Sequence, residues 1–315
     1  MTTPDVTILL STAEARDRSL ARAAAKKRVT RLRRGAYVDT AVWSRLRPYQ
    51  RYAARVKATT LMLPDAVLCL ESAAVHWGLP VFGEPTDIHL YAPDRTESRG
   101  YRHGTDVVHT SADAKEIVRV DGVRVTSILD TALDLIRVLP LALGVAVVDA
   151  ALRAGVTREE FEALLAIQKN RRGRRAAAEA IRRGDARSGS VLESVSRVVI
   201  ELLGYPAPEL QTEFRIGSGR AFTDFFWREA GIVGESDGNA KYFGQKGPTD
   251  EVIRQERRRE VELRRLVSGL ARWEWKDAFD PASLDLILSQ AGLTRMRPRQ
   301  PRIELAIRNG RTSAS

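Results

Sequence analysis

The spacing of apolar residues changes from a helical to a strand pattern near the start of the chain. Residues 11–27 are rich in alanine and arginine, which favour helix. Apolar and polar residues then alternate over 29–38, on both sides of Arg33-Arg34-Gly35. This pattern predicts a helix followed by a hairpin of two short strands with a basic tip.

The middle of the chain is predicted to mix short strands with helices. Residues 87–91 alternate like a strand, and Asp121-Gly122 lies between two apolar runs, as in a hairpin whose turn needs positive φ. Helical spacing follows at about 127–138, 141–154, 157–167 and 174–183. A polar, glycine-containing stretch near residue 185 indicates a domain boundary there.

The rear of the chain predicts one sheet with helices packed on it. A helix is expected over 190–203, followed by strands at 211–216, 221–227 and 231–237, a charged helix at 249–267, a strand at 272–275 and a last helix that starts at Asp280-Pro281 and ends at Gly292. This order requires a mixed sheet.

We therefore expect an α+β or α/β multidomain protein. Its predicted parts are a winged-helix-like segment (1–50), a mixed α/β middle domain (51–185), a rear domain (186–295) and a flexible basic tail (296–315).

Charge adds a candidate partner to this architecture. The formal net charge is +11, with 43 arginines among the 51 basic residues. The excess is concentrated: 11 basic against 4 acidic residues in 1–50, 8 against 2 in 169–187, and 6 against 1 in 295–311. Concentrated positive charge favours a polyanion such as DNA, because it displaces counterions from phosphates. The alternative is the arginine bias of a GC-rich genome.

Other features exclude several classes of protein. No run of 18 apolar residues exists, so no membrane span is expected, and the first ten residues do not resemble a signal peptide. The single cysteine, Cys69, rules out a disulfide framework within one chain. These features together predict a cytoplasmic location.

The basic hairpin is the first candidate site. Arg31, Arg33 and Arg34 lie on or beside its tip, where a winged helix contacts the DNA backbone. The alternative is a basic hairpin without a role in DNA binding.

The second candidate site is acidic. A hairpin centred between Glu229 and Ala230 places Asp224 opposite Glu235, with side chains on one face of the sheet. Asp237 is two residues further on and shares that face. Carboxylates this close repel each other unless one is protonated, a cation bridges them or arginines lie between them. We expect Asp224 and Glu235 to hold Mg²⁺, which prefers oxygen ligands; the alternative is salt bridges to Arg228, Arg220 or the helix at 254–265.

Glu193 has two possible roles in the same domain. Ser190 and Glu193 have the spacing of a helix capping box, with Arg197 as a partner one turn later. Structural capping is the favoured interpretation, and a place at the edge of the metal site is the alternative.

The rear motifs resemble a known superfamily. Asp224-Phe225 followed by Glu235-Ser236-Asp237-Gly238 is similar to the mismatch-repair-endonuclease-like domain of unknown function in the PD-(D/E)xK nuclease superfamily. The resemblance implies a restriction-endonuclease-like core that cuts DNA with Mg²⁺, with Glu193 as its early glutamate. The chain departs from the pattern at Asp237, where the superfamily usually has lysine, and Lys241 is the candidate substitute.

The front half resembles another family. Residues 30–37, 70–80 and 128–136 are similar to parts of AbiE-type abortive-infection antitoxins. This resemblance implies a winged helix that binds promoter DNA and a second domain that neutralises a toxin. The expected first helices are shortened here.

Two functions follow from these expectations. The first is a DNA-binding, Mg²⁺-dependent endonuclease-like protein of phage defence or toxin–antitoxin biology. The second is a non-enzymatic antitoxin or repressor whose nuclease domain is degenerate. The oligomeric state, the toxin and the preferred DNA stay open.

Overall fold

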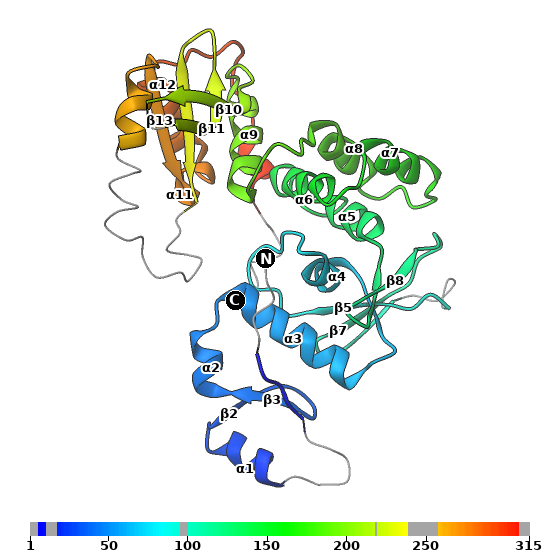
Figure 1. Ribbon diagram of the computed structural model, residues 1–315. Coiled ribbons are helices and arrows are strands. Elements are labelled where there is room, and N and C mark those ends of the chain that lie inside the picture. The colour runs from blue at the N-terminus through cyan, green and yellow to red at the C-terminus, as the bar shows by residue number, and fades with distance from the viewer. Residues whose placement is uncertain (1–5, 11–17, 95–99, 218, 239–257, 309–315) are drawn as a thin grey trace. The chain divides into compact units, whose positions relative to one another are not determined.

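The computed structural model describes residues 6–10, 18–94, 100–217, 219–238 and 258–308. The chain is a mixed α/β protein with three sheets, and it divides into two compact units (Figure 1). Unit 1 contains Met1–Val138, Glu159–Arg174 and Asn309–Ser315, and unit 2 contains Leu139–Arg158 and Arg175–Arg308. The division differs from the boundary that the sequence suggested near residue 185, because helices before that point group with the rear sheet.

The start of unit 1 has the predicted basic hairpin. Strands β2 (Val29–Arg33) and β3 (Ala36–Asp39) pair antiparallel through a turn at Gly35, whose φ of +83° favours glycine. Strand β1 (Leu9–Leu10) adds to β3, and helix α1 (Arg18–Ala25) precedes the hairpin. Two helices follow, α2 (Thr40–Arg45) and α3 (Pro48–Met62). Val6, Val38 and Ala54 form the core of this part.

The rest of unit 1 is built around a six-stranded sheet. Its strand order is β6-β7-β5-β4-β9-β8. The strands are β4 (Val67–Leu68), β5 (Ile88–Tyr91), β6 (Tyr101–His103), β7 (Asp106–His109), β8 (Ile117–Val120) and β9 (Val123–Thr126). The helices are α4 (Leu70–Trp77), α5 (Ile128–Ile136) and α7 (Arg158–Ile167). Asp121 and Gly122 both have positive φ, which confirms the predicted turn.

From residue 191 to residue 274, unit 2 has the element order that the sequence predicted. Helix α9 (Val191–Leu203) is followed by β10 (Glu209–Ile216), β11 (Gly219–Trp227) and β12 (Ile232–Asp237), then a helix at residues 258–264 and β13 (Gly269–Glu274). Their order in the sheet is β10-β11-β12-β13, and only β12 and β13 run parallel. Helices α6 (Leu141–Arg153), α8 (Arg174–Arg183), α11 (Trp275–Ala278) and α12 (Pro281–Gln290) complete the unit. Residues 249–257 of the predicted charged helix lie outside the described residues, and Trp275, predicted to end a strand, begins the unpredicted helix α11.

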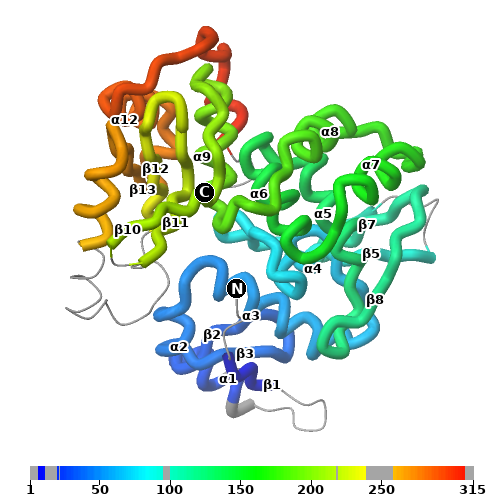
Figure 2. Tube along the Cα trace, turned by 45° about the horizontal axis from the view of Figure 1, so that its top comes forward, coloured from blue at the N-terminus to red at the C-terminus, as the bar shows by residue number. Residues whose placement is uncertain are grey.

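Both faces of this sheet are covered. Trp273 of β13 donates from Nε1 to Ser196 of α9 at 2.7 Å, and Figure 2 shows α9 beside the strands. On the other face, Phe226 and Val233 pack against Leu263 of the helix at 258–264. The strands between these layers carry the candidate acidic site.

The basic tail is not loose over its described part, which corrects the prediction for residues 296–308. The backbone amide of Met296 donates to the carbonyl of Gly204, and that of Gln300 donates to Leu202. The short helix η2 (Ile303–Ala306) buries Ile303, and Ile307 is buried just after it. Ile303 and Ile307, four residues apart, bury their side chains and anchor this segment, although its arginine- and proline-rich composition predicts a loose tail.

Candidate carboxylate site

The predicted hairpin register is confirmed. Phe225 pairs with Gly234, and Phe226 pairs with Val233. Phe226 and Val233 share the face that packs on Leu263. Because side chains alternate along a strand, the side chains of Asp224 and Glu235 leave the backbone on that same face of the sheet.

Gly234 has a packing reason to lack a side chain. A Cβ at this position would lie 2.7 Å from Trp273 and 3.0 Å from Trp227. Glycine at this position therefore lets β12 pack closely against the two indole rings, with Glu235 as the next residue of the strand.

Asp224 is bound by neutral donors. Its Oδ2 accepts hydrogen bonds from the backbone amide of Ser236 at 2.9 Å and from the Ser236 hydroxyl at 2.8 Å. Its Oδ1 lies 3.3 Å from Nε2 of Gln211. These contacts orient the carboxylate and leave its charge without a counter-ion among the hydrogen bonds and ion pairs of the described residues.

Glu193 lies in the first turn of α9 and shares a donor with Asp224. Its backbone amide donates to the Ser190 hydroxyl at 3.1 Å, so Ser190 caps the helix, and the return bond of a capping box, from the Ser190 amide to the Glu193 carboxylate, is not among the described hydrogen bonds. Its Oε2 accepts from the amide of Gly189 at 2.7 Å and from Gln211 Nε2 at 2.9 Å. Burial, and then the charge of Asp224, raise the pKa of Glu193 above its ordinary value. Glu193 and Asp224 therefore share the side-chain amide of Gln211.

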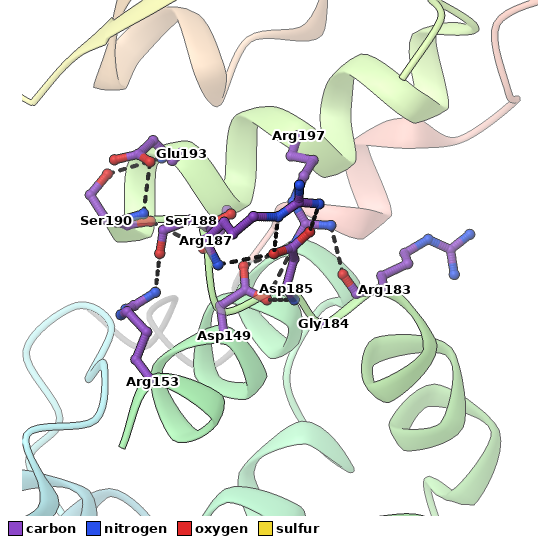
Figure 3. Close-up of polar contacts among 12 residues, drawn as sticks. Asp149, Arg153, Arg183, Gly184, Asp185, Arg187, Ser188, Ser190, Glu193 and Arg197 are labelled. Carbon is purple, nitrogen blue, oxygen red and sulfur yellow. Dashed lines mark hydrogen bonds and ion pairs between the residues drawn. The ribbon is translucent and has the colours of Figure 1, made fainter. Parts of the chain in front are cut away.

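The expected pairing of Glu193 with Arg197 is absent from the structure. Arg197 donates instead to Asp149 of α6, at 2.8 Å and 3.1 Å, and to the carbonyl of Arg183 at 2.6 Å (Figure 3). The Asp149 side chain is fully buried, so it requires a charged partner and holds Arg197 away from Glu193. Burial, opposed mainly by Arg197, raises the pKa of Asp149.

Gln211 belongs to this site although the sequence did not suggest it. Its amide lies between the carboxylates of Glu193 and Asp224. Its φ of +51° is unusual for a non-glycine residue inside a strand. The signal in the sequence is the preceding hairpin: Leu210 pairs with Phe225 and Thr212 with Thr223, so Gln211 lies opposite Asp224.

Glu235 differs from Asp224 because arginines bind it. The residue is 7% exposed, and its carboxylate contacts Arg259 at 3.2 Å and Arg272 closely. Arg272 also reaches Asp237 at 3.3 Å and Glu260 at 3.5 Å. The predicted alternative, a salt bridge to the helix at 254–265, is therefore confirmed for Glu235 by Arg259. The other two predicted partners bind elsewhere: Arg228 pairs with Glu209, and Arg220 pairs with Glu213.

The remaining sequence candidate, Lys241, lies outside the described residues. Among the residues that are described, no three His, Cys, Asp or Glu side chains are placed to hold one metal ion together. Glu193 and Asp224 are the two carboxylates that share one neutral donor.

The basic hairpin divides its arginines between two roles. Arg33 contacts Asp106 at 3.0 Å and the Thr59 hydroxyl at 2.7 Å, so its side chain joins the hairpin to α3 and β7. Its DNA contact stays a prediction, and it requires that an ion pair which is only 19% and 15% exposed break first. Arg31 and Arg34 are exposed.

Comparison with known proteins gives relatives but no family. No family model matches the chain. The chain is 34% identical over 175 residues to "Uncharacterized protein Rv2248" of Mycobacterium tuberculosis strain H37Rv, and equally to "Uncharacterized protein MT2308" of strain CDC 1551. The match covers 54% of this chain and 62% of each relative, so it spans less than two thirds of their length.

A membrane-spanning helix is not found in the part of the chain that the structure describes. None of those helices combines the length and the apolar composition that a bilayer crossing needs.

Proposed function

We propose that this chain is a DNA-binding protein and that unit 2 is a Mg²⁺-dependent, endonuclease-like domain that hydrolyses phosphodiester bonds. The observation that carries the proposal is the convergence of Glu193 and Asp224 on the single amide of Gln211. Neutral donors satisfy the hydrogen bonds of both carboxylates but do not offset their charge.

The donor set fits a hard divalent cation. Carboxylate oxygens are the ligands Mg²⁺ prefers, and Mg²⁺ commonly uses one or two of them while keeping several waters. Asp224 and Glu193 would hold it, with Glu235 as the next carboxylate on the Asp224 face of the sheet. When bound, Mg²⁺ supplies an acidified water and positive charge for a phosphodiester.

Other side chains have separate roles in this proposal. Arg259 and Arg272 pair with Glu235, and in this proposal they would have to exchange that carboxylate for the phosphate of a DNA backbone. Asp237 is half-exposed and bound to Arg272, so it lies at the rim and is the least supported of the catalytic candidates.

The front half supplies DNA affinity in this proposal. Arg31 and Arg34 are the exposed arginines of the hairpin, and residues 1–50 carry 11 basic against 4 acidic residues. The resemblance to AbiE-type antitoxins suggests phage defence or toxin–antitoxin biology, with a cognate toxin as a possible partner of unit 1.

Nicking of supercoiled plasmid DNA in Mg²⁺ or Mn²⁺ tests the enzymatic proposal. We expect nicking by the native chain and at least about a hundredfold loss in Asp224→Asn, which keeps the shape of the side chain. Glu213→Gln is the matched control, because Glu213 is a partly exposed acid of the same sheet that pairs with Arg220. Absence of nicking with either metal, or equal nicking by Asp224→Asn, contradicts the proposal.

One observation favours the non-enzymatic alternative. Glu235 is already neutralised by Arg259 and Arg272, which removes one of the two expected metal ligands. In that case the chain binds DNA as a repressor without cutting it. Sequence-preferring, salt-sensitive binding together with no nicking in either metal would select this alternative.

A further inference from the structure

One peptide group of unit 2 joins an arginine to Glu193. The carbonyl oxygen of Ser188 accepts a close hydrogen bond from Nη1 of Arg153, at the end of α6. The N–H of the same peptide group belongs to Gly189 and donates to Glu193 Oε2 at 2.7 Å. Figure 3 shows Arg153 below the loop and Glu193 above it.

This arrangement has an electrostatic consequence. A guanidinium on the carbonyl oxygen of a peptide polarises the group and strengthens its N–H as a donor. The carboxylate of Glu193 accepts that N–H, so positive charge on Arg153 stabilises the negative charge of Glu193 without touching it.

We infer that Arg153 is a positioning residue for Glu193 and acts through the Ser188–Gly189 peptide. Ser188 is fully buried, so its carbonyl needs a protein partner, and Arg153 supplies one. Gly189 allows the close approach, since a Cβ there would lie 3.3 Å from Glu193 Oε1. The functional meaning rests on the proposed role of Glu193; the contact between Arg153 and the loop does not.

The same loop contains a matched control. Arg158 donates to the carbonyls of Ile181 and Gly184, the latter at 2.7 Å, but not to the peptide that touches Glu193. Arg153 and Arg158 therefore both bind backbone carbonyls in this region. Only one of them acts on the Glu193 hydrogen bond.

The first readout needs neither metal nor activity. The amide proton of Gly189 is followed by NMR in the full-length chain and in the variants Arg153→Met, Arg158→Met and Glu193→Gln. We expect a large shift of this proton in Arg153→Met and Glu193→Gln, and little change in Arg158→Met. Arg153→Lys keeps a charged donor and is expected to restore most of the native shift.

The second readout is Mn²⁺ binding. We expect Arg153→Met to weaken Mn²⁺ binding about tenfold, as removal of a group behind a metal ligand commonly does, with Arg158→Met close to the native value. Equal changes in the two variants, or no change of the Gly189 proton in Arg153→Met, overturn the inference. No Mn²⁺ binding by the native chain, with the specific Gly189 shift intact, contradicts the proposed function and leaves the positioning contact standing.

Discussion

Two pairs of carboxylates in unit 2 are treated differently by this fold. Glu193 and Asp224, the neutral-donor pair, accept hydrogen bonds from backbone amides, a hydroxyl and one side-chain amide. Glu235 and Asp237, the arginine-bound pair, contact guanidinium groups. Nearness in the fold therefore does not make carboxylates equivalent.

The difference teaches which acids are available to a cation. A carboxylate that is bound by arginine has its charge offset within the protein, and a metal has to displace that arginine. The carboxylates of the neutral-donor pair have no such offset among the described hydrogen bonds and ion pairs, and burial together with the charge of Asp224 raises the pKa of Glu193, as uncompensated negative charge does. The neutral-donor pair is thus the better cation site, although the sequence pointed to Asp224 with Glu235.

The largest expected effect comes from breaking the arginine-bound pair. Arg272→Met leaves buried Glu235 with Arg259 as its one remaining arginine partner among the described residues, and we expect a loss of about 2–4 kcal/mol in the free energy of unfolding. Arg228→Met is the control: both partners of its pair with Glu209 are exposed, so its loss of stability is expected to be much smaller. Urea unfolding measures both, and equal losses would contradict the distinction.

The neutral-donor pair is tested by Mn²⁺ affinity. Asp224→Asn is expected to weaken binding at least tenfold, or about 1.4 kcal/mol, whereas Asp237→Asn changes it less than about twofold. Calorimetric titration of Mn²⁺ into each variant checks this. A larger loss in Asp237→Asn would move the cation site to the arginine-bound pair.

The hairpin shows the same contrast on a smaller scale. Arg31→Ala and Arg34→Ala should each reduce the slope of log affinity for DNA against log salt by about 1, the value for one lost phosphate contact. Arg33→Ala should leave that slope unchanged and instead destabilise unit 1 by about 1–2 kcal/mol, because Asp106 and Thr59 lose their partner. Salt titrations of DNA binding separate the two outcomes, and a reduced slope in Arg33→Ala would support its predicted DNA contact.

The pH dependence of stability gives the smallest and most local test. The pKa of Glu193 is raised above 4.5 in the folded chain, so the folded state binds more protons than the unfolded state. Stability contributed by this group is therefore lost as pH rises from 4.5 through the raised pKa, and it is constant above that. The free energy of unfolding, measured with urea at several pH values, should lack this pH dependence in Glu193→Gln and should retain it in Glu213→Gln.

Local patterns explain why much of the fold was predictable. The turn at Asp121-Gly122, the cap at Ser190 and the order of elements in unit 2 depend on residues close in sequence. The strand register around Phe225 and Gly234 also followed from its hairpin. Each of these features depends on backbone geometry that few residue types satisfy.

The partners of the charged residues were less predictable, because they come from distant parts of the chain. Arg272 reaches Glu235 across a parallel pair of strands, and Arg33 reaches Asp106 across 73 positions. Arg197 pairs with Asp149 and not with Glu193, because the fully buried Asp149 carboxylate requires a charged partner, whereas Glu193 already accepts hydrogen bonds from other donors. The docking of Ile303 and Ile307 was likewise hidden by the basic composition around them.

The most direct test of the cation site is an anomalous difference map from crystals of the full-length chain grown with Mn²⁺. The account predicts a peak within ligand distance of Asp224 and Glu193, and its loss in Asp224→Asn. A peak held by Glu235 and Asp237 without Glu193, or no peak in this sheet at Mn²⁺ concentrations that support nicking, would contradict it.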